Sequence, residues 1–369
     1  MSVVPVEQAE VVEYLLDHGL LDASSVVDGG VIVRDASSRN RNFIVERRDG
    51  PGLVLKQGIG ALGVATVAHE ARVYRTLTAG GNAMAAWLPP VYGYDEARGV
   101  LAIGLVADGS DLRTHQVRSG RFPAQLAAAL GRALGSLHRL TEFAEETVAP
   151  QVAPWVLSLH RPDLSVFRDT SAAGIELIKI VQRAPGFAGQ LDELRAGWRV
   201  SALVHHDVKW DNCIVFARGK SRRTRGLKLI DWESASAGDP CWDIGSALSH
   251  YLSSWLFSIP VTGATPPARF PQLAEHPLER MQPALRACWS AYVAKRGLSD
   301  AAAHERLLVA VRYAAARLVQ SAFEAAQMAD QLTSSLVLHL QLALNILQRP
   351  REAVVHLLGL PGGEAGTGR

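Results

Sequence analysis

The segment from Leu203 to Val215 constrains this chain more than any other part of its sequence. Two runs of apolar residues, typical of buried strands, flank a short polar loop. The loop places a carboxylate at Asp207 and an amide at Asn212, five residues later. A further apolar run, Leu227 to Ile230, ends at a second carboxylate, Asp231. We therefore expect these three polar side chains to form a chemical centre carried by a small β element.

This combination of donors suits phosphoryl transfer to a hydroxyl. One carboxylate orients the attacking hydroxyl and accepts its proton, while an amide oxygen and another carboxylate hold Mg²⁺ against the phosphates. On this interpretation Asp207 is the candidate base, and Asn212 and Asp231 are the candidate metal ligands.

Composition fits a globular chain with room for two lobes. Of its 369 residues, 48% are hydrophobic and 20% are charged. The formal net charge is only +2, so no global field favours nucleic acid or an anionic membrane as a partner. The three cysteines are scattered and lack CxxC spacing, which indicates no zinc site and favours the cytoplasm. No signal peptide is visible, and the most apolar helical stretch, 241–261, contains Asp243 and Pro260, so we expect no membrane span.

The order of predicted elements indicates an α+β protein. We assign residues 1–106 to a first lobe, which is rich in strands. Its predicted elements are a leading helix within 1–22, strands over 25–34, 42–48 and 53–57, a helix over 66–78, and strands over 87–94 and 99–106. An Asp-Gly-Pro-Gly turn at 49–52 separates the second strand from the third.

Residues 107–359 are predicted to form a mostly helical second lobe, which includes the segment 203–233 and a two-stranded element over 202–231. The predicted helices cover 123–140, much of 143–200, 239–258, 278–296, 299–327 and 331–348, with a proline-containing loop at 260–277. The glycine-rich end, 360–369, is expected to be a disordered tail.

A lysine and a glutamate in the first lobe add to the chemical centre. Lys56 follows the apolar residues of a predicted strand, and Glu70 lies in the middle of the next helix. Such a pair is a known device, in which the lysine grips the phosphates of a nucleotide and the glutamate fixes its aim. A lysine alone at the end of a strand is usually only solvated. The glutamate, and the place of both before Asp207, favour the functional interpretation.

Together these segments resemble the aminoglycoside phosphotransferase and choline kinase-like superfamily. The resemblance rests on Val204–Asp207 with Asn212, on Leu229–Glu233, on Ala237–Pro240, on Trp242–Gly245 and on Leu130–His138. It implies a bilobal, protein kinase-like fold with an antiparallel sheet in a nucleotide-binding N-lobe and a mostly helical C-lobe that supplies acceptor-binding helices.

The resemblance also implies an ATP- and Mg²⁺-dependent kinase with particular site residues. It implies that Asp207 is the catalytic base and that Asn212 and Asp231 are the Mg²⁺ ligands. It implies that Lys56, paired with Glu70, contacts the ATP phosphates, and that the nucleotide-covering loop contains Ser37, Ser38, Arg39 and Asn40. It also implies that the backbone of Leu105 and Val106 contacts adenine, and that His205 and Asp243 support the catalytic loop.

Two departures from the family pattern bear on the acceptor. His206 stands where relatives usually have glycine, and its ring either touches the acceptor or fills space. The loop 36–42 contains no glycine, so contacts to phosphates there must come from side chains and backbone. Glu233 lies two residues beyond Asp231, where it either approaches the metal or acceptor or is a solvated acid.

The identity of the acceptor stays open. The region 240–330 is not evidently acidic but contains several aromatic residues, which favours a small molecule less cationic than an aminoglycoside, such as another antibiotic or a metabolite. The alternatives are Ser or Thr of a ribosomally made precursor peptide, phosphorylated during dehydration, and a non-catalytic ATP-binding scaffold. The basic segment 218–225 is either a solvated hairpin tip or a contact for a peptide or acidic partner. A partner protein or a homodimer is also possible.

Overall fold

The computed structural model describes residues 4–37, 39–81, 83–143, 153–164, 166–218, 224–260 and 267–360. The chain divides into two compact units. Unit 1 comprises Met1–His115 and Asp211–Ala235, and unit 2 comprises Gln116–Trp210 and Ser236–Arg369. The predicted boundary at 106/107 placed the whole of 203–233 in the second lobe. That division into two lobes at 106/107 stays a prediction.

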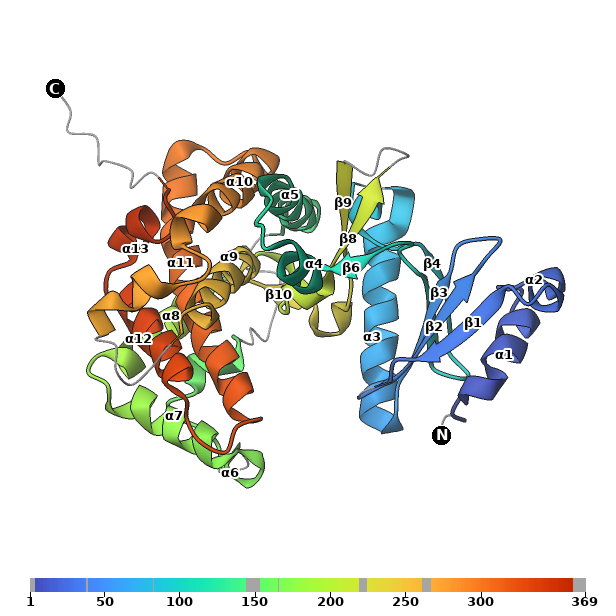
Figure 1. The fold of residues 1–369 in the computed structure, drawn as a ribbon, viewed down its shortest axis with the longest axis horizontal. Helices are drawn as coiled ribbons and strands as arrows, with labels where there is room; N and C mark the ends of the chain where they lie inside the picture. Colours follow the sequence, from blue (N-terminus) through green and yellow to red (C-terminus); the bar gives the residue numbers. More distant parts are fainter. Residues whose placement is uncertain are drawn as a thin grey trace. The chain divides into compact units, whose positions relative to one another are not determined.

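Unit 1 is built on a five-stranded antiparallel sheet with the strand order β1-β2-β3-β5-β4 (Figure 1). Its elements are α1 (Val11–Asp17), α2 (Ala23–Val27), β1 (Val31–Asp35), β2 (Arg41–Arg47), β3 (Leu53–Gln57), α3 (Gly60–Thr78), β4 (Val91–Asp95), β5 (Val100–Gly104), β6 (Ser110–Asp111), β8 (Cys213–Arg218) and β9 (Thr224–Leu229), with short 3₁₀ turns at Gln8–Glu10, Ala79–Gly81, Ala85–Trp87, Trp210–Asn212 and Trp232–Ser234. The last three strands form a second antiparallel sheet, in the order β6-β8-β9.

Alternation along β3 decides which way Lys56 points. Leu53 and Leu55 are buried in one core with α1, to which β2 adds Phe43 and Val45. Because successive side chains of a strand point to opposite faces, Lys56 lies on the other face of the sheet. The apolar residues of the strand thus fix the direction of its one charged side chain.

The prediction of a single strand over 25–34 is wrong in its first part. The β-branched Val26 and Val27 favour a strand locally, but residues Ala23–Val27 form α2. Tertiary contacts explain the difference, because the buried Ser25 donates a hydrogen bond to Asp49 (2.7 Å). Gly29 then adopts a positive φ of 61°, which ends the helix and lets β1 start at Val31.

Unit 2 is mostly helical. Its elements are α5 (Ala124–Leu140), α6 (Val166–Asp169), α7 (Ala172–Arg183), α8 (Phe187–Ala196), β7 (Ala202–Val204), β10 (Ser236–Gly238), α9 (Pro240–Phe257), α10 (Leu278–Arg296), α11 (Asp300–Ala326), α12 (Ser334–Gln348) and α13 (Pro350–His356), with 3₁₀ turns at Trp155–Ser158 and Pro267–Leu273; α4 (Leu112–Ser119) crosses from unit 1. The antiparallel pair β7–β10 is its small sheet.

Two glycines let the helices of unit 2 approach closely. A Cβ atom on Gly131 of α5 would lie 2.1 Å from the carbonyl oxygen of Cys288 on α10. A Cβ atom on Gly245 of α9 would lie 2.5 Å from the carbonyl oxygen of Ala310 on α11. Any larger residue at either position would push two helices apart. The second contact matters for function, because α9 and α11 both support the loop around Asp207.

The α+β class with an antiparallel sheet in the N-terminal part is confirmed. In the part of the chain that the structure describes, no helix is long and apolar enough to cross a membrane. Most of the basic segment 218–225 and nearly all of the predicted tail 360–369 lie outside the described residues.

Candidate active site

The centre of unit 1 is a lysine surrounded by carboxylates. Lys56 Nζ lies 2.6 Å from Glu70 Oε2 and 2.7 Å from Asp231 Oδ1. Lys56 comes from β3, Glu70 from the middle of α3, and Asp231 from the end of the β9 segment. Residues 56, 70 and 231 are thus brought together from three separate segments, as the sequence pattern suggested.

Burial and charge act against each other in this cluster. Burial alone lowers the pKa of Lys56, but the carboxylates of Glu70 and Asp231 outweigh it and hold that pKa above its ordinary value. Burial raises the pKa of Glu70, whose side chain is only 2% exposed, and the neighbouring Lys56 ammonium opposes that rise. Lys56 is therefore a fixed cation, aimed by Glu70.

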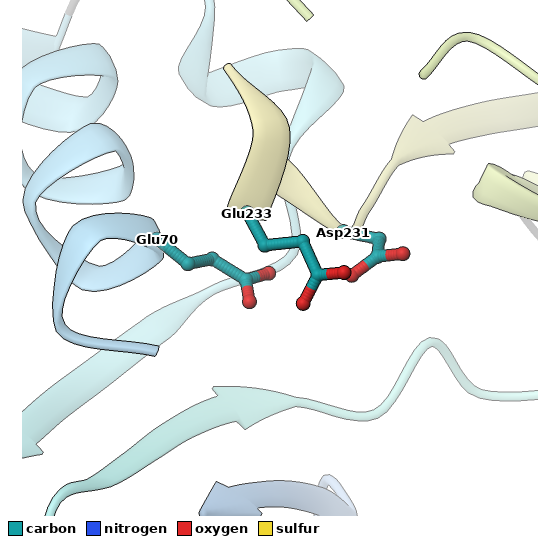
Figure 2. A group of neighbouring side chains, drawn as sticks. All are labelled: Glu70, Asp231 and Glu233. Atoms are coloured by element: carbon teal, nitrogen blue, oxygen red, sulfur yellow. The ribbon is translucent and has the colours of Figure 1, made fainter. Parts of the chain in front are cut away.

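Glu233 belongs to the same cluster. Figure 2 shows the carboxylates of Glu70, Asp231 and Glu233 turned toward one another, and one oxygen of each lies within 4.8 Å of the others. Lys56 Nζ lies 3.2 Å from Glu233 Oε2. The side chain of Glu233 is 14% exposed. These contacts disfavour the interpretation of Glu233 as a solvated acid.

The loop before β2 closes one side of the cluster. Arg39 pairs with Glu233 Oε1 at 3.2 Å, and the Asn40 side-chain amide donates to Glu233 Oε2 at 3.4 Å. Ser37 is turned inward to its own loop, because its N–H donates to Asp35 and its hydroxyl accepts from the Asn42 N–H. Ser38 lies outside the described residues.

A pocket of about 250 Å³ in unit 1 contains the cluster. It is lined by Arg39, Asn40, Asn42, Val54, Lys56, Glu70, Ile103, Asn212, Ile230, Asp231 and Glu233. Asn212 is held there by its backbone, whose carbonyl oxygen accepts a hydrogen bond from the Ile230 N–H. At the predicted adenine contact the Leu105 N–H donates to Gly52. Among the described residues, the Val106 N–H has no hydrogen-bond partner.

Helix α3 also anchors the segment that carries Asp231. The backbone N–H of Trp232 donates to Glu70 Oε1 at 3.2 Å, and the Trp232 ring is fully buried. The ring of His69, the neighbour of Glu70, bonds to the Ala235 carbonyl at 2.7 Å. Asp231 itself adopts a positive φ of 66°, a conformation that costs free energy in a non-glycine residue and needs such support.

The predicted base, Asp207, lies in unit 2 on the loop that follows β7. Its Oδ2 is 2.6 Å from Lys209 Nζ, and its Oδ1 is 3.6 Å from the guanidinium of Arg317 on α11. Burial by itself raises the pKa of Asp207, but Lys209 and Arg317 outweigh burial and keep that pKa below its ordinary value. The carboxylate is therefore ionised at neutral pH, as acceptance of a hydrogen bond from a hydroxyl requires.

Asp243 holds the backbone before Asp207. This fully buried residue of α9 accepts hydrogen bonds from the N–H groups of His205 (2.7 Å) and His206 (3.0 Å). Its Oδ2 also meets His138 Nε2 at 3.1 Å. Burial raises the pKa of Asp243, yet these hydrogen bonds, above all that of His138, bring it below its ordinary value. The contacts match the role in steadying the loop that the family resemblance implied for Asp243.

His206 adopts a positive φ of 64°, which explains why a glycine would suit this position. Its ring stacks on Trp198, with centroids 6.0 Å apart. Its Nε2 is buried, and a Cβ atom on Gly238 would lie 3.2 Å from it. Burial lowers the pKa of His206. Of the two alternatives for this ring, the contacts favour filling space.

Sequence reasoning gave no role to two cations beside Asp207. Lys209 lies within the loop that the sequence singled out, and its short distance to Asp207 is a signal that only a structure provides. Arg317 is 110 residues away along the chain, on a long helix with many alanines and arginines. No local pattern distinguishes it from its neighbours.

A lysine on a strand, paired with a glutamate and lying beside a carboxylate and an amide, is an arrangement that suits phosphoryl transfer. Comparison with known proteins agrees. The model of the phosphotransferase enzyme family (APH) matches residues 31–265, which is more than half of the chain. The chain therefore belongs to this family, and it is a phosphotransferase with an alcohol group as acceptor.

Solved structures with a similar fold include a choline kinase and an ethanolamine kinase. Choline kinase from Cryptosporidium parvum is 11% identical, with 95% of this chain and 98% of that chain covered and a TM-score of 0.56. Ethanolamine kinase from Plasmodium vivax is 10% identical, with 95% and 91% covered and a TM-score of 0.54. At such identities the likeness shows the fold alone. No curated protein sequence matches the chain.

Proposed function

We propose that the protein transfers the γ-phosphate of ATP to a hydroxyl of a small molecule, such as an antibiotic or a metabolite, with the help of Mg²⁺. The observation that carries this proposal is the buried contact of Lys56 with Glu70 and Asp231. A cation so fixed suits anionic phosphates, because it costs no reorganisation when the nucleotide binds. Membership of the family supplies the reaction class.

The other site residues that the sequence predicts in residues 1–106 take nucleotide-binding roles in this proposal. Lys56 contacts the phosphates, and the side chains of Arg39 and Asn40, with Ser37 and Ser38, form the covering loop. The backbone at Leu105 and Val106 faces adenine, where the Val106 N–H, which has no hydrogen-bond partner among the described residues, can donate.

The donor set of this pocket fits a magnesium ion. Mg²⁺ prefers oxygen ligands, and carboxylate oxygens of Asp231 and Glu233 lie within 4.8 Å of each other, with Asn212 on the wall of the same pocket. Asn212 and Asp231 would hold the ion, and Glu233 offers a further ligand. When bound, Mg²⁺ neutralises negative charge on the phosphates.

Asp207 orients the acceptor in this proposal and takes its proton. Its ionised carboxylate accepts the hydrogen bond of the hydroxyl, so that an oxygen lone pair points at the phosphorus. The chain joins Asp207 to Asn212 over five residues. The cations Lys209 and Arg317 beside Asp207 disfavour an ammonium group near the reacting hydroxyl, so we expect an acceptor that is neutral or anionic at that point.

The test is a screen for ATP consumption with Mg²⁺ over neutral, anionic and cationic alcohols, antibiotics and Ser/Thr peptides, with products weighed by mass spectrometry. We expect a mass gain of one phosphate on a small molecule, and a loss of about 1,000-fold or more in the Asp207→Asn variant. The matched control is Asp192→Asn, which alters an acid of unit 2 that pairs with His160 and Arg161.

Transfer that persists in Asp207→Asn would contradict the role of this residue. Phosphate found only on a peptide would contradict the small-molecule acceptor, and tight ATP binding without any phosphorylated product would favour a scaffold. We expect the protein to act in the cytoplasm, a setting that suits its three buried free cysteines.

A further inference from the structure

Arg317 is a buried cation that the reaction described so far does not use. It lies on α11, and its side chain is 3% exposed. Its guanidinium is 3.6 Å from Asp207 Oδ1, and its Nε has no hydrogen-bond partner among the described residues. Removing a guanidinium from water costs several kcal/mol unless a charge compensates it. Asp207 is the carboxylate that does so here.

The Trp242 ring contacts both the Arg317 guanidinium and the loop that carries Asp207. The guanidinium carbon of Arg317 lies 5.7 Å from the centroid of the Trp242 ring. The indole N–H of Trp242 donates to the His206 carbonyl at 3.0 Å, while the His206 N–H donates to Asp243. Helices α9 and α11 thus hold both the backbone next to Asp207 and the charge beside its carboxylate.

The charged groups around Asp207 differ in how firmly they are placed. Lys209 belongs to the same loop, and its side chain is 34% exposed. His205 also lies on this loop, and a positive charge on its ring would lower the pKa of Asp207 further. Asp243 approaches from α9 but is saturated by backbone N–H groups and His138. Arg317 is therefore a cation beside Asp207 that comes from a long helix, α11, and is almost fully buried.

The geometry points to Arg317 as a positioning residue that acts through Asp207. It keeps this carboxylate ionised and in place when an acceptor hydroxyl competes with Lys209 for Oδ2. The ammonium of the partly exposed Lys209 is less firmly placed than the buried guanidinium of Arg317, which packs against an indole ring. This inference rests on the proposed role of Asp207 as the residue that orients the acceptor.

The first test measures the coupling between the two residues without any substrate. Melting temperatures of Asp207→Asn, Arg317→Met and the double variant are compared at pH 7. We expect the double variant to lose less than the sum of the two single losses, because either single change already removes the ion pair. Arg312→Met is the control, since Arg312 lies on the same helix but pairs with Glu193. We expect the loss of melting temperature in Arg312→Met to add to the loss in Asp207→Asn when the two changes are combined.

The second test is the pH profile of ATP hydrolysis by water, with ATP and Mg²⁺ as the only added ligands. Removing a cation within 4 Å of a carboxylate raises the pKa of that carboxylate. The acidic limb of the profile, where the hydrolysis rate falls as the pH falls, should therefore lie about one pH unit higher in Arg317→Met. The acidic limb of Arg317→Lys should move less. The KM for ATP should stay within about twofold in both variants, because Arg317 belongs to unit 2 whereas the residues that line the nucleotide pocket belong to unit 1.

Strictly additive melting losses, together with an unmoved acidic limb, would overturn the inference and leave Arg317 a residue of the core. If Arg317→Met does not fold, the limb of Arg317→Lys decides alone. A failure of the proposed function looks different, because hydrolysis and transfer would then survive in Asp207→Asn while the melting comparison still reports the Asp207–Arg317 contact.

Discussion

Lys56 holds together carboxylates that would otherwise repel one another. Its ammonium lies within 3.2 Å of an oxygen from each of Glu70, Asp231 and Glu233. In water such contacts contribute little, but the low exposure of Glu70 makes this one expensive to break. The same residue therefore serves the stability of unit 1 and, in the proposed reaction, the grip on the phosphates.

The variant Lys56→Met separates these two roles. We expect ATP turnover to fall by about 100-fold or more, and the free energy of unfolding to fall by about 3 kcal/mol because Glu70 is left buried without its cation. Mg²⁺ should raise the melting temperature of the variant more than that of the wild type, since the cluster of three carboxylates then lacks the Lys56 cation that contacts all of them. Lys179→Met, which alters an exposed lysine of α7, is the control; an equal Mg²⁺ effect in wild type and Lys56→Met would argue against a metal site.

Glu233→Gln asks whether this acid serves the metal or the acceptor. A neutral amide is a weaker ligand for Mg²⁺, so we expect the Mg²⁺ concentration for half-maximal turnover to rise by about tenfold. The KM for the acceptor should change little. Titrations of Mg²⁺ and of acceptor, each at saturation of the other, distinguish the cases. A rise in the acceptor KM alone would instead place Glu233 beside the acceptor.

There is a physical reason why the sequence predicts Lys56, Glu70 and Asp231 as site residues but does not predict Arg317. Lys56, Glu70 and Asp231 each stand at a definite place in a local pattern, at the end of an apolar run or in the middle of a helix, so position and residue type together were informative. Arg317 has no such pattern. Its meaning comes from the close packing of α9 on α11, which depends on contacts between residues far apart in the sequence.

At the scale of elements, α9 and α12 meet around a histidine that is held neutral. His339 of α12 is fully buried, and its Nδ1 lies 2.8 Å from the Ser335 carbonyl. A carbonyl only accepts, so Nδ1 carries the proton and Nε2 accepts from the Ser253 hydroxyl of α9, 2.9 Å away. Burial lowers the pKa of His339 to about 4.

This histidine predicts how stability depends on pH. In the unfolded chain His339 takes up a proton near its ordinary pKa of 6.5, whereas in the folded protein it does so only near pH 4. Unfolding therefore takes up a proton between these values, and the free energy of unfolding falls as the pH falls, by up to about 3 kcal/mol from this group. In His339→Gln this part of the loss should vanish, as measured by denaturant unfolding from pH 7 to pH 4. Gln341→Ala, on the exposed side of α12, should keep the wild-type slope. An unchanged slope in His339→Gln would refute the assignment.

Elements in which apolar residues recur at regular spacing were predictable from the sequence. A short element held by tertiary contacts was not. The helix over 299–327 corresponds to α11, and the strand over 53–57 to β3. Residues Ala23–Val27 contain β-branched valines, yet form a helix because Ser25 is fixed by Asp49 and Arg47. Such hydrogen bonds join residues more than 20 positions apart, and no local propensity contains them.

At the scale of the whole molecule, the division between the two units falls inside the segment from Leu203 to Val215. Asp207 belongs to unit 2, whereas Asn212, Asp231 and Lys56 belong to unit 1. In the proposed reaction, unit 1 therefore carries the nucleotide and metal contacts, and unit 2 carries the group that handles the acceptor. The short chain between Asp207 and Asn212 is shared by both tasks.

This division predicts that Mg²⁺ with a non-hydrolysable ATP analogue protects unit 1 selectively. A ligand at 100 times its Kd stabilises its binding site by about 2.7 kcal/mol, so amide exchange in β3, α3 and residues 231–235 should slow by about 100-fold. Exchange in α12, which no proposed ligand touches, should stay within about twofold. Hydrogen exchange followed by mass spectrometry measures both, and Lys56→Met, whose phosphate contact is removed, should lose most of the protection. Slowing confined to the helices of unit 2 would place the nucleotide elsewhere and contradict the assignment of the Lys56 cluster.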